Sequence, residues 1–235
     1  MGNPCIPKIP SRQKMIKLVA FDWNGTLLAD TQTIVDCTNL EIKSYGLKPQ
    51  TIKEYRETFV IPVNLYFKNI GVNPRLLEKH SSKFAEIFHE NYEELVKRCR
   101  TRKGARKLLS HIANNKMRSV IFSNHSAEKV RQQCDRLKIS SFFDAILGND
   151  HTHDAYTVKG KEKRLIDHIK RSKTKNSEVL IIGDTDEEII IGHDMGSKTI
   201  AITNGHSTTL RLRAAKPDYL INNLEEVIGI IKKLN

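Results

Sequence analysis

The chain has 235 residues, 39% of them hydrophobic and 28% charged, with a formal net charge of +12. This profile is typical of a globular protein of one large or two modest domains. No apolar run approaches the ~18 residues of a membrane-spanning helix, so we expect no membrane partner.

The positive charge favours anionic partners, such as phosphorylated metabolites or nucleic acid. Solvated helix faces are the better explanation for most of it, so nucleic acid is an unlikely partner on this evidence. The four cysteines are scattered, with no Cys-x-x-Cys pair and no metal-ligand spacing with His. Such cysteine usage indicates a reducing compartment, and we predict a cytoplasmic protein.

The first predicted element is a short buried strand over residues 18–21, which ends in Asp22. A Gly25-Thr26 turn and then a long helical pattern follow. Open α/β sheets place their chemistry at the carboxyl ends of strands, so Asp22 is a candidate functional residue. An ordinary strand end followed by a turn would give the same pattern.

The block that follows predicts helices only. Asp30 or Thr31 could cap a helix over residues 33–45, and Pro74 suits the first residue of a later helix. The basic run at residues 97–107 could bind phosphates, but a solvated joint between two domains is the better interpretation.

From residue 117 onward, short strands alternate with helices, which predicts a parallel, doubly wound sheet. Strands are expected at residues 118–122, 145–147, 179–182, 199–202 and 219–221, and helices at 126–137, 161–171, 187–195 and 224–234. We therefore predict an α/β fold with a Rossmann-like core and an inserted all-helical cap. The predicted parts are an N-terminal arm (1–15), the core (16–30 and 105–235) and the cap (31–104).

Polar side chains follow several of these strands. Ser123 and Asn124 end the second strand just before a helix, where backbone amides can cradle a phosphate, although simple helix capping explains them as well. Lys159 precedes the next helix and could neutralise a phosphate, although a lone surface lysine is commoner. Asp184 ends the fourth strand, as Asp22 ends the first. Two converging carboxylates suit Mg²⁺, and with a hydroxyl and an ammonium they make a phosphoryl-transfer site.

The order Asp-x-x-Gly-Thr, Ser-Asn after a strand, Lys, and Gly-Asp-Thr followed by an acid resembles the haloacid dehalogenase superfamily. The helical block resembles the cap of its phosphoglycolate-phosphatase-like and β-phosphoglucomutase-like members. The resemblance covers nearly the whole chain and implies a Mg²⁺-dependent hydrolase, most simply a phosphatase of small phosphate esters.

The resemblance also implies site roles. Asp22 would be the nucleophile that forms a phospho-aspartyl intermediate. The metal ligands would be Asp22, the backbone carbonyl of Asn24 and Asp184, with Glu188 as the second acid of the last motif. The phosphoryl group would be bound by Ser123 and Lys159, with Thr26 and Asn124 as further substrate contacts.

Asn24 departs from the family pattern, because phosphatases of this family carry a general acid–base Asp there. An amide can hydrogen-bond a leaving-group oxygen or orient a water, but it cannot exchange a proton. That exchange is typically worth ~10²–10⁴-fold in rate. Three explanations are open: the leaving group needs no proton, another group such as His125, His206 or a cap residue supplies it, or the activity is low or absent.

Two other functions stay open. The Asp-Trp-x-Gly-Thr form also resembles phosphonoacetaldehyde hydrolase, which uses a cap lysine as a Schiff base; Lys53 and Lys68 are cap lysines without its Met-Gly-x-x-Lys context. A weakly active phospho-ligand or nucleic-acid binder is the other, and the net charge is its one direct hint.

Overall fold

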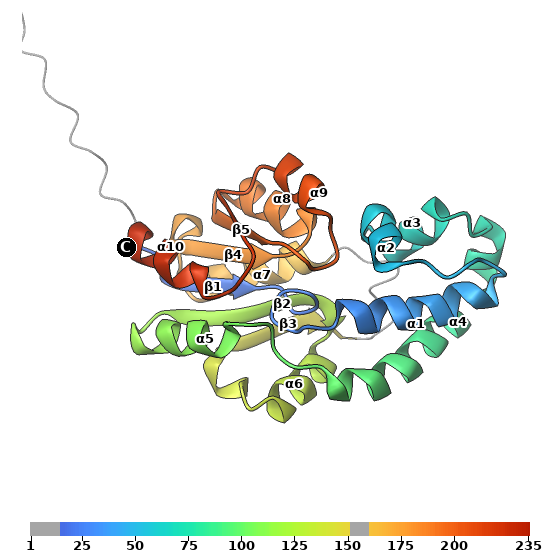
Figure 1. Cartoon of the computed structure of the whole chain (residues 1–235). Coiled ribbons are helices and arrows are strands. Elements are labelled where there is room, and N and C mark those ends of the chain that lie inside the picture. The colour runs from blue at the N-terminus through green and yellow to red at the C-terminus, as the bar shows by residue number, and fades with distance from the viewer. Residues whose placement is uncertain (1–14, 151–159) are drawn as a thin grey trace, which may run out of the picture.

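The computed structural model describes residues 15–150 and 160–235, with residues 80–85 described by their backbone alone. Its centre is a six-stranded parallel sheet with the order β3-β2-β1-β4-β5-β6 (Figure 1). The strands are β1 (Leu18–Phe21), β2 (Arg118–Ser126), β3 (Ala145–Asn149), β4 (Val179–Gly183), β5 (Lys198–Ile202) and β6 (Tyr219–Ile221).

The strand order reverses at β1. The chain adds β2 and β3 on one side of β1, then returns to add β4, β5 and β6 on the other. Open α/β sheets bind ligands in the crevice outside the carboxyl ends of the strands at such a reversal. The topology therefore places the crevice beside the ends of β1 and β4.

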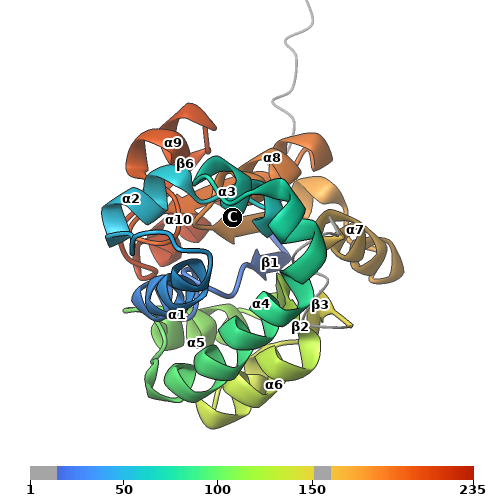
Figure 2. The same ribbon diagram turned by 90° about the vertical axis from the view of Figure 1, so that its right-hand side faces the viewer.

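Helices cover both faces of the sheet (Figures 1 and 2). One face packs against α5 (Ala105–Asn114), α6 (Ala127–Arg136) and α10 (Glu226–Leu234), and the other against α7 (Lys161–Arg171) and α8 (Asp186–Met195). Along β1, Val19 and Phe21 face the first layer, whereas Leu18 and Ala20 face the second. Burial on both faces explains why the strand is a continuous apolar run.

Four helices inserted between β1 and β2 form a separate block, which we call the helical insertion (Figure 1). Its helices are α1 (Thr31–Ser44), α2 (Ile52–Thr58), α3 (Val63–Asn69) and α4 (Pro74–Leu95). They share their own apolar core, which includes Val35, Ile42, Tyr55, Tyr66 and Phe67. Figure 1 shows the insertion beyond the end of the sheet at which β1 leads into α1.

The two connections between core and insertion lie side by side. The backbone of Ala29 donates to the carbonyl of Arg100 (2.9 Å), and that of Arg102 to the carbonyl of Leu27 (2.8 Å). Leu28 and Thr101 form an antiparallel bridge between these hydrogen bonds. A 3₁₀ turn over Val96–Arg98 precedes the returning connection, so most of the basic run at 97–107 lies in this joint, as expected.

The predicted fold class is confirmed, with differences at individual elements. β2 continues to Ser126 rather than ending at residue 122, because its polar end pairs with β3 after a shift of register. The helix α5 was not predicted, and α9 (Thr209–Ala214) was not either. Two further 3₁₀ turns cover Ser140–Phe142 and Asn176–Glu178. None of the helices in the described residues has the length and apolar content of a membrane span.

Candidate active site

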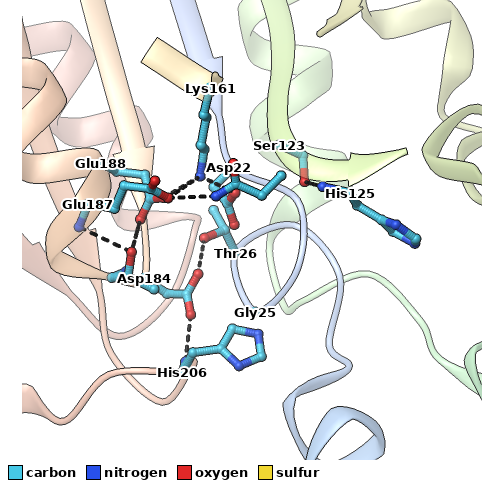
Figure 3. Close-up of polar contacts among 12 residues, drawn as sticks. Asp22, Gly25, Thr26, Ser123, His125, Lys161, Asp184, Glu187, Glu188 and His206 are labelled. Carbon is cyan, nitrogen blue, oxygen red and sulfur yellow. Dashed lines mark hydrogen bonds and ion pairs between the residues drawn. The ribbon is translucent and has the colours of Figure 1, made fainter. Parts of the chain in front are cut away.

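Asp22 and Lys161 form a buried ion pair at the end of β1. Asp22 directly follows the strand, and Lys161 is the first residue of α7. Lys161 Nζ lies 2.6 Å from Asp22 Oδ1 and also contacts Glu188 Oε1, and the lysine is 3% exposed (Figure 3). Glu187 Oε2 lies 3.6 Å from the same nitrogen. A single ammonium therefore joins the carboxylate at the end of β1 to two carboxylates in the first turn of α8.

The burial of this pair changes both acidities. Burial raises the pKa of Asp22 well above its usual range; Lys161 lowers it, while Glu188 and Asp184 raise it further. For Lys161, burial alone would lower the pKa, but the attraction of Asp22 and Glu188 raises it above its ordinary value. The lysine thus keeps its charge in the site.

Asp184 is fixed at the neighbouring strand end by two loops. Its Oδ1 accepts from Thr26 Oγ1 and its Oδ2 from the backbone N–H of His206, both at 2.6 Å. Gly25 has φ +73°, and a Cβ there would lie 2.4 Å from Asp184 Oδ2; a Cβ at Gly205 would lie 2.0 Å from the same atom. Only glycine allows both loops to approach so closely. Burial and the charge of Glu188 raise the pKa of Asp184 to about 6.

The donor set fits a hard divalent cation. Asp22, Asp184 and Glu188 are three buried carboxylates; burial, first, and the neighbouring carboxylates, second, raise the pKa values of both aspartates. Within residues 15–150 and 160–235, no group of three or more His, Cys, Asp or Glu side chains is arranged as a ready-made metal site. Mg²⁺ usually takes one or two carboxylates and keeps several waters, so two aspartates suit it.

Asn24 is held by groups from the joint and from α4. Its Nδ2 donates to Asp30 Oδ2 (2.6 Å) and to Tyr92 Oη (2.8 Å), and Tyr92 Oη donates to Asp30 Oδ2 (2.6 Å). The backbone N–H of Gly25 donates to Asp30 Oδ1 (2.8 Å). The carboxylate of Asp30 therefore accepts hydrogen bonds from these three donors. It does not cap α1 with its side chain, as one of the two predicted capping residues would have done. Burial raises the pKa of Asp30, although His206 and these hydrogen bonds act against it.

Burial favours the uncharged form of two of the histidines that line the cavity, His125 and His206. Burial lowers the pKa of His206 to about 4, and its Nδ1 lies 3.0 Å from Tyr55 Oη. Burial, with the nearby His89, lowers the pKa of His125 to about 3. Figure 3 shows the His125 ring turned away from the carboxylates. Neither imidazole holds the extra proton of an imidazolium for a leaving group.

A cavity of about 150 Å³ runs from Asp22, Ser123 and Lys161 into the helical insertion. Its walls in the insertion are largely apolar and include Ile34, Tyr55, Phe59, Val63, Tyr66 and Phe88. The helix α2 closes it against the loop after β5, because Arg56 donates to the carbonyls of Gly205 (2.8 Å) and Asn204 (2.9 Å). Arg211 of α9 also donates to the carbonyl of Phe59.

Comparison with known proteins decides the family. The model of the haloacid dehalogenase-like hydrolases matches residues 19–202 of this chain, which include both aspartate strand ends, Ser123 and Lys161. The chain belongs to the haloacid dehalogenase-like hydrolase family. The family predicted from the motifs is thereby confirmed, and the protein is a hydrolase.

Two curated relatives of this haloacid dehalogenase-like chain are named pyrophosphatase PpaX. The protein of Bacillus mycoides is 23% identical over 220 residues, covering 94% of this chain and 99% of its own length. That of Bacillus cereus is 22% identical over 223 residues, covering 94% and 98%.

Solved structures share the fold. A haloacid dehalogenase-like hydrolase from Streptococcus pneumoniae superposes with a TM-score of 0.77 at 20% identity, covering 92% of this chain and 98% of its own. A predicted phosphoglycolate phosphatase from Haemophilus somnus gives 0.73 at 16% identity, covering 92% and 97%. At such identities the likeness shows the fold alone.

The structure brings most of the predicted site residues of this haloacid dehalogenase-like chain together. Ser123, 2% exposed, lines the cavity, and its Oγ accepts from the backbone N–H of His125 (3.1 Å). Asn124 lines it too and donates to Glu187 Oε2 (2.8 Å). Thr26 is fully buried behind Asp184 and does not line the cavity. Glu188 Oε2 accepts from the backbone N–H (3.0 Å) and Oγ1 (2.7 Å) of Thr185.

Lys159 lies outside the described residues. The lysine beside Asp22 is Lys161, two residues further on, which sequence reasoning did not select. Its position could have indicated it. A lysine at the start of a helix is disfavoured by the helix dipole, so it is expected to have an acidic partner from another element. Tyr55 and Tyr92, which reach the site from the insertion, were missed as well.

Proposed function

We propose that the protein is a Mg²⁺-dependent phosphatase of small phosphate esters, with a phospho-aspartyl intermediate on Asp22. The observation that carries this proposal is the placement of Asp22 and Asp184 at adjacent strand ends, with Lys161 Nζ 2.6 Å from Asp22. A carboxylate nucleophile beside a buried cation is what phosphoryl transfer to a side chain requires.

Asp22, Asp184 and the backbone carbonyl of Asn24 would hold the Mg²⁺ ion, which would neutralise charge on the phosphoryl oxygens. Lys161 and Ser123 would bind those oxygens, while the role given to Lys159 stays a prediction. An oxygen of Asp22 would attack phosphorus as the bond to the leaving-group oxygen breaks. Water would then hydrolyse the aspartyl phosphate, releasing inorganic phosphate and regenerating the carboxylate.

Other predicted residues take supporting roles in this proposal. Thr26 would orient Asp184 rather than touch substrate, because its hydroxyl donates to that carboxylate. Glu188 would hold Lys161, since its Oε1 accepts from that ammonium while its Oε2 accepts from Thr185, and its place among the metal ligands stays a prediction. The helical insertion would act as the cap that closes over the substrate. The free, buried Cys37, Cys99 and Cys134 support a cytoplasmic location.

The alternatives receive less support. Lys53 and Lys68 are exposed, and neither lines the cavity, so a Schiff-base lysine for a phosphonate substrate is missing at these positions. Arg136 of α6 donates to the carbonyl of Cys99 within the basic run, and Arg106 of α5 donates to the carbonyl of Lys138. These contacts support a structural role over nucleic-acid binding.

The test is phosphate release from acetyl phosphate, an activated substrate, with and without Mg²⁺. We expect Asp22→Asn to abolish turnover with its circular dichroism spectrum unchanged, because the amide is not a nucleophile. Asp36→Asn, at an exposed position of α1, is the matched control and should behave as the native protein does. Most of the activity surviving in Asp22→Asn would overturn the mechanism.

A further inference from the structure

The cavity continues past the proposed phosphoryl site into an aromatic chamber of the insertion. The rings of Tyr55, Phe59 and Tyr66 pack on one another, with centroid separations between 4.9 and 5.8 Å. Ile34, Val63 and Phe88 complete the apolar wall. The whole cavity, from Asp22 to these rings, has a volume of about 150 Å³. Its apolar end therefore offers a flat, aromatic lining that suits one aromatic ring.

The walls of this chamber offer little to an anion. Among the described lining residues there is no arginine, and Lys161 is the one lysine, already paired with Asp22 and Glu188. Glu41, 1% exposed, adds an acid to the lining. A leaving group with a second phosphate or a carboxylate would bury a charge beside aromatic rings, which is costly.

Two arginines that approach from outside are already engaged. Arg56 donates to the carbonyls of Gly205 and Asn204, and Arg102 to those of Gly25 (2.6 Å) and Thr203 (2.7 Å). Neither lines the cavity. Their hydrogen bonds hold the loops in place, so these arginines are not free to bind an anionic substrate.

The chemistry at Asn24 suits a leaving group that departs without a proton, and a phenol is one such group. Its amide donates to Asp30 and Tyr92 and has no proton to transfer. An alkoxide needs such a proton when its bond to phosphorus breaks, whereas a phenol-type oxygen, with a pKa of about 10, departs more readily without one.

Resting on the proposed phosphatase function, we propose that the substrate is a phosphate monoester of a single-ring, uncharged phenol, whose ring occupies the chamber of Tyr55, Phe59 and Tyr66. The phosphoryl group then lies at Asp22 and Lys161, and the ester oxygen at Asn24. Pyrophosphate and phosphoglycolate, whose leaving groups are anionic, are poor substrates by this assignment.

Binding of phosphonates tests the chamber without any chemistry. The probes are benzylphosphonate, methylphosphonate and phosphonoacetate, titrated by calorimetry into the native protein with Mg²⁺. Burial of one ring predicts that benzylphosphonate binds at least about tenfold tighter than methylphosphonate, and that phosphonoacetate gains nothing. Val63→Phe, which narrows the chamber, should remove most of that advantage. Leu65→Phe, at an exposed position of the same helix, should keep it.

Hydrolysis rates separate this inference from the proposed function. Turnover of acetyl phosphate that needs Asp22 supports the phosphatase, and phenyl phosphate should then exceed phosphoglycolate and pyrophosphate in kcat/KM. If acetyl phosphate is hydrolysed but benzylphosphonate binds no tighter than methylphosphonate, or phosphonoacetate binds tightest, the aromatic assignment is wrong and the phosphatase stands. If benzylphosphonate binds tightest and nothing is hydrolysed, the proposed function fails, and the catalytic part of this inference fails with it.

Discussion

The side-chain amide of Asn24 donates a 2.6 Å hydrogen bond to the carboxylate of Asp30. This contact lies across the joint between β1 and the helical insertion, and Tyr92 of α4 completes it. An aspartate at position 24 would face the Asp30 carboxylate with like charge. The asparagine therefore adds a hydrogen bond to the joint at the position where the resemblance to the family phosphatases leads us to expect an acid.

Replacement of Asn24 by Asp tests what that acid would add. Two adjoining buried carboxylates share one proton, so the pair should titrate with one strongly raised pKa and present an acid to the leaving group. We expect kcat/KM for ethyl phosphate to rise by up to ~10²-fold, with a much smaller change for acetyl phosphate. Steady-state rates between pH 5 and 8 give the measurement.

The matched control is Asn24→Asp combined with Asp30→Asn, in which the new acid no longer shares a proton. Its gain on ethyl phosphate should be smaller near pH 7, because an unraised aspartate is ionised there. No gain in either variant would show that another group supplies the proton, and a loss on both substrates would show that the amide itself is required.

The second prediction concerns Lys161. Lys161→Met leaves buried carboxylates without their cation, and breaking such a cluster typically costs about 3–5 kcal/mol of unfolding free energy. Urea denaturation at pH 7 measures this loss, and activity should disappear with it. Lys163→Met, at an exposed position on the same helix, should stay within about 0.5 kcal/mol of the native protein. Equal stabilities of the two variants would refute the central role of Lys161.

The third prediction is a pH dependence from His125. Its folded-state pKa of about 3 lies below the usual 6.5, so the unfolded chain takes up this proton first as the pH falls. Stability is therefore lost from about pH 6.5 downward until the pH approaches 3, by up to about 1.4 kcal/mol per pH unit. His125→Gln removes this one contribution. Denaturation of both proteins at pH 7, 6, 5 and 4 should show stabilities that diverge in favour of the variant; parallel curves would contradict the buried, neutral histidine.

The fourth prediction concerns the contact between α2 and the loop after β5. Arg56→Ala removes two hydrogen bonds that hold the insertion against the core, so the open arrangement should gain population. Spin labels at Leu40→Cys and Leu210→Cys, in a Cys5→Ser background, report the distance between insertion and core. The variant should show a broader distribution than the native protein, which a phosphate mimic narrows again. Arg75→Ala, exposed on α4, is the control; a single distribution under all conditions would mean that the insertion does not move.

Sequence reasoning recovered the sheet because its strands have local signatures. Apolar runs such as Val179–Ile182 are buried on both faces and end in turn residues, so they are visible without tertiary information. The polar end of β2 carries no such signal, since its extension depends on pairing with β3. The helix α5 was not predicted because its basic start, with Arg106 and Lys107, falls in the basic run that indicates a joint. Its apolar residues Leu108, Leu109 and Ile112 face the core.

The same distinction holds for the site: residues at strand ends were predictable from the sequence, and residues brought in by tertiary contacts were not. Asp22 and Asp184 follow strands that the order of motifs places together. The contacts of Tyr55 with His206 and of Tyr92 with Asp30 join residues 151 and 62 positions apart. Such pairs arise from how the insertion rests on the core, which no local pattern encodes. Lys161 could be found only from the odd position of a lysine at a helix start.

The paired connections at Leu27–Ala29 and Arg100–Arg102 have a consequence for how this protein can change over evolutionary time. The chain leaves the core and returns to it through two paired connecting segments. The two ends of the insertion are therefore held side by side, regardless of the length of chain between them. The entropy of closing such a loop varies only slowly with its length. Helices can therefore be gained, lost or exchanged beyond these segments while β1 and β2 keep their register. New substrate preferences can be acquired in the insertion while the strands that carry Asp22 and Asp184 stay in place.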